Sequence, residues 1–519
     1  MDLRCLSVLS ILFYISGVQS DNILALFPRV EKSHYIVFKK LLIELAKRGH
    51  NIDVVIGGVE RPYEVESIPG ITFFELPKLK NFSLPHFTLS DLRKFSVNFA
   101  IKFMFPISAT AFCEDSFRSD TMINLRDSKK KYDLIILEIF ICDCFFGFAE
   151  TFKAPVVSLI SSSDLPWGGY RIGNPDNPAY IPVYFQGYRP HKYLYDRFWN
   201  TIAYLQAKIG HRWYSRKQTQ ISREFFGKDL PDLNDIVANT SLLLVNSHLS
   251  VNMARPTVPN FIEVGGLHIE SPKTPKKEIL NFIGKDKFIY FSLGSLVQSE
   301  TLEEDTLKMF MDVFSKLKYK VLWKANATEI SKIIQPPPNM LVHHWFPQLD
   351  ILCHANAVLF ITHAGLQGTQ EAVYCGVPML CIPLFADQYQ NCQNMVERNA
   401  AKTFTLETIT RAEFKDLLLE IIENPRYKKN VLRLSEEFKD RPMSPLETAV
   451  YWVEYVLRHK GAPQLKTPSI ALEWYQYYLF DVFCVFFFFI VLSSGVGYIL
   501  LTKIFKGILR KNSPKSKKN

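Results

Sequence analysis

The residue types best suited to binding chemistry lie close together between Trp345 and Gln388. This stretch carries an indole, an imidazole, two side-chain amides and two carboxylates, at Trp345, His363, Gln348, Gln388, Glu371 and Asp387. An indole offers a flat π-face, an amide can donate and accept hydrogen bonds, and a carboxylate can accept them from hydroxyls. Together they can hold a ring and several hydroxyl groups. The alternatives are a Trp345 packed in the core, a Glu371 on a solvated helix face, and an ordinary turn at Asp387 and Gln388.

A turn inside this stretch is suited to an anionic group. His363 closes the apolar run Phe360-Ile361-Thr362 and precedes a predicted helix, so its imidazole and the first helical N–H groups can converge on a phosphate. Small residues at Ala364, Gly365 and Gly368 allow close approach. The alternative for the imidazole is an ordinary buried histidine.

A second candidate group lies near the N-terminus. His34 follows the first predicted strand and stands near the start of the next helix. An imidazole with an ordinary pKa of about 6.5 can accept a proton from a hydroxyl, although a lone histidine there is more often a helix cap or core residue. Glu138 and Asp143 both follow another predicted strand, and either carboxylate could orient it.

The elements that must position these groups alternate between apolar strands and helices. The first series of predicted strands comprises Ile23–Phe27, Ile52–Ile56, Ile71–Phe74, Leu134–Leu137, Val156–Ile160 and Leu242–Val245. The second comprises Phe288–Ser292, Lys320–Trp323, Leu341–Trp345, Val358–Thr362 and Met379–Pro383. Continuous apolar strands are typical of buried parallel sheets, so the pattern predicts two doubly wound α/β domains with a ligand cleft at their strand ends. We expect domains at 21–250 and 286–460, joined by a proline-rich linker at 251–285.

The two ends of the chain indicate membrane targeting. Residues 1–20 resemble a secretory signal, with an uncleaved anchor as the alternative, and 482–502 is an uncharged stretch of 21 residues. That length is enough to span ~30 Å of hydrocarbon as a helix. The aromatic juxtamembrane segment 461–481 and the basic tail 503–519 predict a single-pass type I protein with a lumenal body. Lysines third and fifth from the end resemble an endoplasmic reticulum retrieval signal, and a merely solvated tail is the alternative.

Charge and motifs exclude several classes of function. Seven of the ten net positive charges lie in the C-terminal tail, so the remaining +3 excludes a nucleic-acid footprint. The chain contains no Asp-x-Asp, no His-Glu-x-x-His, no Gly-x-Ser-x-Gly and no Gly-x-x-x-x-Gly-Lys motif. We therefore expect no bound metal and no cofactor.

Several motifs together resemble the donor-binding signature of the UDP-glycosyltransferases: Trp345-Phe346-Pro347-Gln348, His363-Ala364-Gly365 and Asp387-Gln388. The similarity extends to Phe291 through Ser295, to Pro256 through His268 and to the membrane anchor, and Asp143-Cys144 is most similar to the insect branch. The resemblance implies a GT-B fold, with two tandem Rossmann-like domains and a C-terminal transmembrane helix, and a UDP-sugar as co-substrate. It also implies an endoplasmic reticulum membrane protein.

The resemblance also implies roles for individual residues. Trp345 would stack on uracil and Gln348 would bind its edge, while Glu371 would accept hydrogen bonds from ribose. His363, Ser295 and the following helix start would hold the diphosphate, and Asp387 with Gln388 would bind the sugar. The whole implied donor set is Ser295, Trp345, Gln348, His363, Gly365, Gln367, Gly368, Glu371, Asp387 and Gln388. Two residues depart from the family pattern: Ala364 replaces a usual second glycine, and Gln367 replaces an asparagine common in vertebrate members.

The implied chemistry is inverting hexose transfer without a metal. His34 matches the family position of the general base, and we choose Asp143 over Glu138 as its carboxylate partner. Glucose is the expected donor and glucuronate the alternative; a non-catalytic relative that binds UDP-sugar beside a paralogue is the other hypothesis. A small lipophilic acceptor is expected against aromatic residues of the long insertions, which could equally be packing residues: Phe82, Phe87, Trp167, Tyr170 and Tyr180.

Further expectations concern modification and assembly. Glycan acceptors are predicted at Asn81, Asn239 and Asn326. Cys5 lies in the signal and Cys484 in the membrane segment, and the other seven of the nine cysteines are interpreted mainly as core thiols. A homo- or heterodimer is compatible with the sequence.

Overall fold

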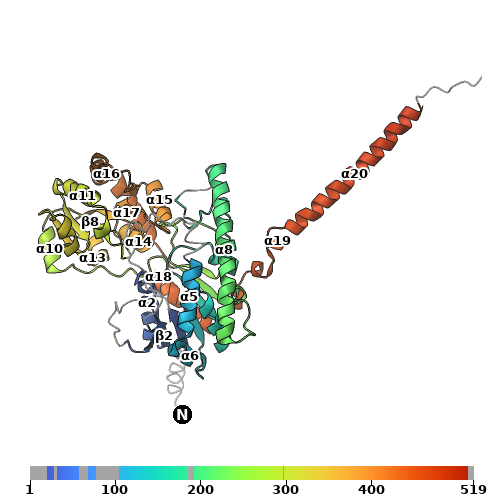
Figure 1. Cartoon of the computed structure of the whole chain (residues 1–519), viewed down its shortest axis with the longest axis horizontal. Helices are drawn as coiled ribbons and strands as arrows, with labels where there is room; N and C mark the ends of the chain where they lie inside the picture. The colour runs from blue at the N-terminus through green and yellow to red at the C-terminus, as the bar shows by residue number, and fades with distance from the viewer. Residues whose placement is uncertain are drawn as a thin grey trace, which may run out of the picture. The chain divides into compact units, whose positions relative to one another are not determined.

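The computed structural model describes residues 20–27, 32–57, 68–77, 105–184, 186–187, 192–295 and 297–511. Two parallel sheets dominate the unit that ends at Lys466 (Figure 1). The first has the order β3-β2-β1-β4-β5-β6-β7, formed by β1 Asn22–Phe27, β2 Asn51–Ile56, β3 Ile71–Glu75, β4 Leu134–Glu138, β5 Val156–Ile160, β6 Leu242–Val245 and β7 Phe261–Glu263. The second has the order β10-β9-β8-β11-β12-β13, formed by β8 Phe288–Ser292, β9 Lys320–Lys324, β10 Met340–His343, β11 Ala357–Thr362, β12 Met379–Cys381 and β13 Ala401–Thr403.

Helices connect and cover these strands. Those of the first part of the chain are α2 Lys32–Lys47, α5 Phe105–Phe117, α6 Asp120–Arg126, α7 Gly147–Phe152, α8 Leu194–Phe226 and α9 Leu233–Ala238. Those that follow are α10 Lys277–Ile283, α11 Glu304–Ser315, α12 Ala327–Ile333, α13 Gln348–Leu352, α14 Leu366–Tyr374, α15 Gln388–Glu397, α16 Arg411–Glu423, α17 Pro425–Lys439 and α18 Pro445–Arg458. The alternation confirms the predicted pair of doubly wound α/β sheets.

Burial explains why both sheets are parallel. Every residue of β5 and β8 is buried, because each sheet carries an apolar core on both of its faces. Strands buried on both sides need no polar alternation, and helical crossovers supply the two covering layers. All predicted strands form, although the one expected at Leu341–Trp345 ends at His343, which leaves Trp345 in the following loop.

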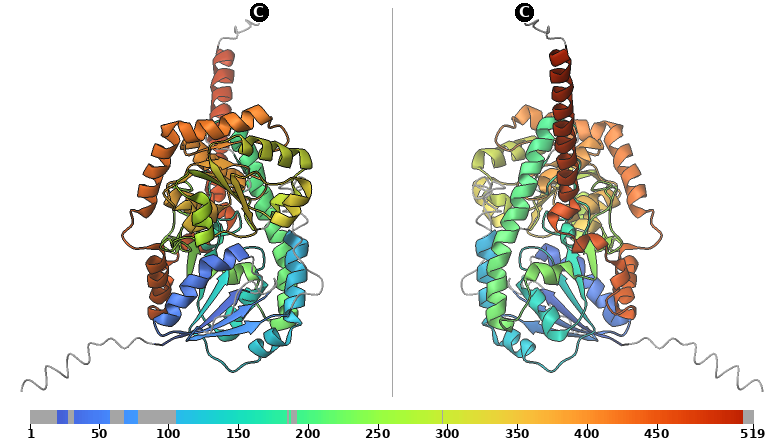
Figure 2. Two further views of the ribbon diagram at one scale, coloured as in Figure 1. Left: turned by 90° about the vertical axis from the view of Figure 1, so that its left-hand side faces the viewer. Right: turned by 90° about the vertical axis from the view of Figure 1, so that its right-hand side faces the viewer.

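The last helix of the second series packs on the first sheet. Ala449, Val450 and Val453 of α18 belong to the same buried cluster as Ile23 of β1 and Leu41 of α2. In both views of Figure 2 the orange-red α18 lies beside the blue α2. The sequence-based range 286–460 therefore misplaces this helix, because its apolar face predicts burial but does not say against which sheet.

Two further details differ from the sequence analysis. The predicted linker 251–285 contains β7, which pairs with β6 and so extends the first sheet. Four cysteines expected as core thiols form the disulfides Cys113–Cys144 and Cys353–Cys375. The pairing depends on distances across the fold, which spacing along the chain does not report.

Residues from Thr467 onward form a separate unit. It contains α19 (Trp474–Tyr477) and α20 (Phe480–Lys511), and an 18-residue window within Phe480–Leu509 has a mean hydropathy of 2.4. It is the one helix in the described part of the chain that is long and apolar enough to cross a membrane. The helix expected at 482–502 is thus confirmed, whereas the signal at 1–20 and the dilysine tail lie almost wholly outside the described residues.

Candidate active site

The predicted general base stands in a defined pair with a carboxylate. His34 lies in the first turn of α2, and its Nδ1 is 2.9 Å from Oε1 and 3.1 Å from Oε2 of Glu138. The register of the sheet explains the meeting: Leu26 of β1 stands opposite Leu137 of β4, so Glu138, the last residue of β4, lies at the same sheet edge as the end of β1, after which α2 begins. The ring of Phe140 stands edge-on to the imidazole, with the centroids 4.9 Å apart. A proton on Nδ1 that is held by the carboxylate leaves Nε2 as the basic atom.

Asp143, the partner chosen from the sequence, does not contact His34. It lies just past β4 at the start of the short helix Cys144–Phe146 and points into the core, where Arg171 Nη1 is 2.6 Å from its Oδ2. His211 Nε2 lies 3.3 Å from the same oxygen. Burial raises the pKa of Asp143, but the charge of Arg171 and the adjacent imidazole of His211 outweigh it and hold that pKa below its ordinary value. The choice of Asp143 as the orienting carboxylate was therefore wrong, and Glu138 replaces it.

The turn after β11 is built around the imidazole of His363. A Cβ atom at Gly294 would lie 2.6 Å from this ring, and one at Gly365 would lie 2.7 Å from its Nε2, so both positions require glycine. Burial, then the charge of Lys324, lowers the pKa of His363 to about 4. Its Nδ1 is buried and has no hydrogen-bond partner among the described residues. A neutral ring with an unused polar atom at a helix start is suited to a hydrogen bond with an anion.

The departure at Ala364 has a visible backbone consequence. Ala364 has φ of +62°, a left-handed conformation that glycine adopts without a steric penalty. Asn391 of α15 compensates by donating from Nδ2 to Ala364 O at 3.1 Å and to Asp387 Oδ2 at 2.8 Å. One side chain thus ties the turn at His363 to the turn at Asp387.

A second group of polar side chains joins α13 to α14. Gln348 Nε2 donates to Glu371 Oε2 at 2.6 Å, and Tyr290 OH donates to Gln348 Oε1 at 3.4 Å. A Cβ atom at Gly368 would come within 3.2 Å of the same Nε2, so a small residue makes room for the amide. Burial raises the pKa of Glu371 to about 7. The structure brings these predicted donor residues together, and in this state they bind one another.

The indole predicted to stack on a ring is accessible. Trp345 is 51% exposed, and Lys324 Nζ lies 4.5 Å from its ring centroid. Lys324 also donates to Gly294 O at 2.8 Å, so the ammonium lies beside the turn that precedes the exposed Ser295. The sequence analysis did not single out Lys324, which ends β9 and brings a positive charge to the edge where the His363 turn lies.

The two halves meet at Asp387. Burial raises the pKa of Asp387 to about 6, and the positive form of His34 acts in the opposite direction, so the two side chains lie within electrostatic reach. The charge of protonated His34 in the first half therefore acts on a carboxylate supplied by the second half. An imidazole–carboxylate pair in the first half, together with a turn holding an unused imidazole nitrogen, an exposed indole and two half-buried carboxylates in the second, is suited to bringing a hydroxyl nucleophile to an activated, phosphate-linked substrate.

Comparison with known proteins agrees with this arrangement. The sequence model described as UDP-glucoronosyl and UDP-glucosyl transferase matches residues 23–518. UDP-glucosyltransferase 2 of Dactylopius coccus is 38% identical over 502 residues, covering 94% of this chain and 95% of the relative. This chain belongs to the UDP-glycosyltransferase family. UDP-glucuronosyltransferase 2B17 of Rattus norvegicus is 30% identical over 512 residues and covers 94% of each chain.

Solved structures confirm the GT-B fold of this UDP-glycosyltransferase. A UDP-glucosyltransferase from Polygonum tinctorium aligns with a TM-score of 0.59 at 15% identity, covering 85% of this chain and 100% of that one. The glycosyltransferase VinC, in complex with DTDP, aligns with a TM-score of 0.58 at 16% identity, covering 84% of this chain and 100% of its own. At such identities the likeness concerns the fold alone.

Two further residues of the predicted donor set, Gln388 and Gln367, lie at the starts of α15 and α14. Gln388 is buried, and its Oε1 accepts hydrogen bonds from Leu384 N at 2.8 Å and Phe385 N at 3.0 Å. Only its amide NH₂ group is thus available to a ligand in this state. Gln367 is half-buried in the first turn of α14, at the same end as Gly365.

Sequence reasoning missed residues that link the halves of the enzyme. Gln370 of α14 donates to Asn246 O at 3.1 Å and accepts from Gly266 N at 3.2 Å, which ties the donor helix to the first sheet. Tyr184 is buried, and burial followed by the charge of Asp387 raises its pKa well above the ordinary value. No local pattern marks either residue, since each depends on contacts across the fold.

The predicted acceptor and glycan residues have mixed positions. Trp167 is buried and donates to Phe140 O. Tyr170 is half-buried with Lys208 Nζ over its ring, whereas Tyr180 is half-buried without a described ring contact.

Asn239 is exposed, and its side-chain oxygen accepts from Lys466 at 2.5 Å. Asn326 caps α12 through hydrogen bonds from Thr328 N and Glu329 N. Phe82, Phe87 and Asn81 lie outside the described residues.

Proposed function

We propose that this glycosyltransferase transfers glucose from UDP-glucose to a hydroxyl group of a small lipophilic acceptor, with inversion at the anomeric carbon. The observation that carries the proposal is the His34–Glu138 pair within electrostatic reach of Asp387. The relative from Dactylopius coccus is named a glucosyltransferase and is more similar than the rat glucuronosyltransferase. The identity difference favours glucose over glucuronate.

In the proposed mechanism the base acts through Nε2 of His34. Glu138 accepts a hydrogen bond from Nδ1 and stabilises the imidazolium that forms as Nε2 takes the proton of the acceptor hydroxyl. The acceptor oxygen then bonds to the anomeric carbon from the side opposite the diphosphate, and the bond between that carbon and the diphosphate oxygen breaks. This direct displacement converts an α-linked donor into a β-glycoside.

The leaving diphosphate needs compensation for its charge. We assign this role to the N–H groups at the start of α14, to neutral His363, to the hydroxyl of Ser295 and to the ammonium of Lys324. Trp345 would stack on uracil and Glu371 would accept from the ribose once nucleotide replaces its contact with Gln348. A lysine at this edge fits transfer without a divalent metal, so we expect activity to persist in a chelator.

A donor panel tests the proposal. Microsomes with the full-length chain are incubated with labelled UDP-glucose or UDP-glucuronate, each with a phenol, a steroid and an anthraquinone, with and without EDTA. We expect glucoside formation that EDTA leaves unchanged. A preference for UDP-glucuronate would make glucuronate, and not glucose, the transferred sugar. UDP binding without any transfer would favour a non-catalytic protein that binds UDP-sugar beside a paralogous transferase.

We also propose a lumenal body in the endoplasmic reticulum, anchored by α20, which Phe480–Leu509 supports by its length and composition. In cells, we expect endoglycosidase-sensitive glycans that disappear when Asn81, Asn239 and Asn326 are all replaced by glutamine. Exit of a Lys515→Ala, Lys517→Ala variant to the cell surface would support the retrieval signal. A chain without glycans and with its body accessible to cytosolic protease would contradict this topology.

A further inference from the structure

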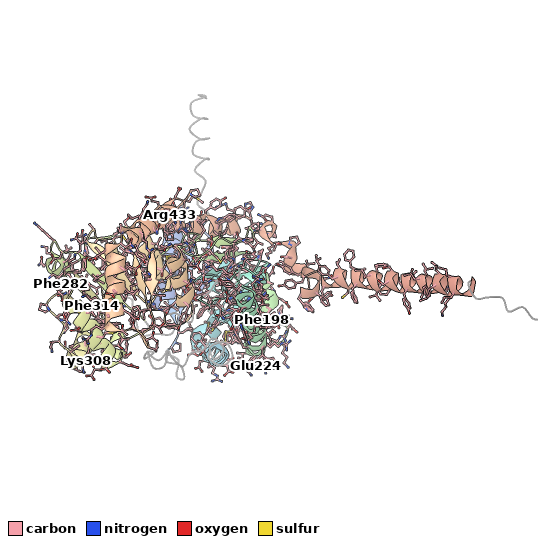
Figure 3. The ribbon with its side chains drawn as sticks, turned by 90° about the horizontal axis from the view of Figure 1, so that it is seen from above. Phe198, Glu224, Phe282, Lys308, Phe314 and Arg433 are labelled. Atoms are coloured by element: carbon pink, nitrogen blue, oxygen red, sulfur yellow. A yellow bond between two sulfur atoms is a disulfide. The ribbon has the colours of Figure 1, made fainter. Side chains whose placement is uncertain are left out.

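The long helix α8 exposes a line of large apolar side chains, which we name the α8 stripe. Its residues recur at helical spacing and have exposed fractions from 46% to 75%: Leu194, Tyr195, Phe198, Trp199, Leu205, Ile209 and Trp213. Figure 3 labels Phe198 and Glu224 of this helix, which is seen nearly end-on there. Single exposed apolar residues are common, but a contiguous row with two indoles indicates an interaction surface.

The opposite face of α8 explains why the stripe stays outside. That face is buried and carries polar anchors, of which Asn200 donates to Pro178 O at 2.7 Å and to Ile181 O at 2.8 Å. Gln218 donates to Ile141 O at 2.9 Å and accepts from Asp143 N at 2.7 Å. Rotation of the helix to bury the stripe would leave these groups without partners inside the protein, which costs about 1–3 kcal/mol for each group. The polar contacts of the buried face therefore hold α8 with its apolar stripe toward solvent.

The charges beside the stripe have one sign. Exposed cations lie along the same part of the chain at Lys192, Arg212, Arg216 and Lys217. Asp196 is the only acidic residue from 192 to 217, and it is half-buried. Lys192 lies 4.0 Å from Glu397 of α15, so the other three form the basic margin of the stripe.

We propose that the α8 stripe docks on the surface of a bilayer that contains anionic lipids. Aromatic and aliphatic side chains bordered by arginine and lysine are the composition of an interfacial helix face, with indoles at the level of the headgroups. The chain also carries α20, whose anchoring would keep the body near a membrane at high effective concentration. A second copy of the chain fits less well, because a two-fold contact through this helix would bring its unpaired cations together.

The test uses the full-length chain in nanodiscs that contain phosphatidylserine and bromine-labelled lipid, which quenches nearby indoles. We compare the wild type with a Trp199→Phe, Trp213→Phe variant, which keeps the stripe apolar but removes its fluorophores. The quenched emission is expected to fall by roughly half or more, because Trp474 is then the main indole expected at headgroup level. Trp345→Phe, which removes the exposed indole in the loop after β10, is the matched control and should leave the quenched emission unchanged.

A second variant separates docking from folding. Leu205→Glu, Ile209→Glu places two charges in the stripe at exposed positions, so its thermal unfolding should match the wild type while quenching of Trp199 and Trp213 is lost. Equal quenching in the wild type and the double phenylalanine variant would overturn the proposal. Efficient cross-linking of an Ile209→Cys variant between two chains in the nanodisc would overturn it too, because the stripe would then be covered by a second copy.

Discussion

The two halves of the candidate site are built in different ways. In the second sheet, the donor-side groups come from neighbouring turns, and His363 is held between Gly294 and Gly365. In the first sheet, His34 and Glu138 are far apart in the chain and meet because β1 pairs with β4. Most predicted donor residues thus come from one continuous stretch of sequence, whereas the pair expected to act on the acceptor comes together through topology.

The ionisable groups of the two halves also differ in how their surroundings affect their charge. Burial moves the pKa of His363 to about 4, of Glu371 to about 7 and of Asp387 to about 6. His34, in contrast, is half-buried and has a carboxylate at hydrogen-bond distance. A base that must receive a proton in each turnover needs a partner for its charged form, whereas a group that only binds an anion can stay neutral.

The largest expected effect concerns the base. His34→Ala should lower kcat by about 10²- to 10⁴-fold while UDP still raises the melting temperature, because the donor half does not need this imidazole. Initial rates and thermal shifts measure the two properties on one preparation. Undiminished transfer would remove His34 from the mechanism.

The second prediction contrasts the two carboxylates near the end of β4. Asp143→Asn should lower the free energy of unfolding by about 3–5 kcal/mol, because Arg171 would be left as a buried unpaired charge. Glu138→Gln should leave stability nearly unchanged and lower kcat instead. Denaturant unfolding of both variants measures the loss of stability, and steady-state kinetics measures the loss of kcat. Equal stability of the two variants would argue against a structural role for Asp143.

The third prediction concerns the exposed indole of the donor half. Trp345→Ala should weaken UDP binding by about 1–3 kcal/mol, the usual contribution of stacking between a base and an aromatic ring. Trp345→Phe should retain most of the affinity because it keeps a π-face. Isothermal titration with UDP measures both, and equal affinities of the alanine variant and the wild type would contradict stacking.

The smallest expected effect is a pH dependence from Glu371. Only the ionised carboxylate accepts hydrogen bonds at both oxygens, and its pKa is about 7, so UDP affinity should rise by up to roughly tenfold between about pH 6 and 8. Stability should change in the opposite direction. Because the folded-state pKa of Glu371 is raised, its protonated form contributes to the free energy of unfolding. This contribution is fully present below about pH 4.5, the ordinary pKa, and is lost as the pH rises through about 7. Glu371→Gln should flatten both profiles, and unchanged profiles would assign the titration to another group.

Particular elements show how far the sequence could be read. Apolar runs predict β1 to β6 and β8 to β12, because strands buried on both faces leave a continuous local signal. The short β7 and β13, of three residues each, leave no such signal. In the site, Gly365 and Gly368 were predictable from the need for close approach, whereas Lys324 was not, since lysine at a strand end is usually solvated.

By itself, the sequence determined the two α/β series, the apolar C-terminal helix and the grouping of donor residues around His363. These features depend on periodicity and on residues that are close in the chain, and the order of residue types along the sequence encodes both directly. Only the tertiary structure decided that Glu138 rather than Asp143 faces His34, that α18 packs on the first sheet, and that α8 turns its aromatic side to solvent. Each of these depends on which distant surfaces meet, and strand register, buried ion pairs and polar anchors select among them only once the chain has folded.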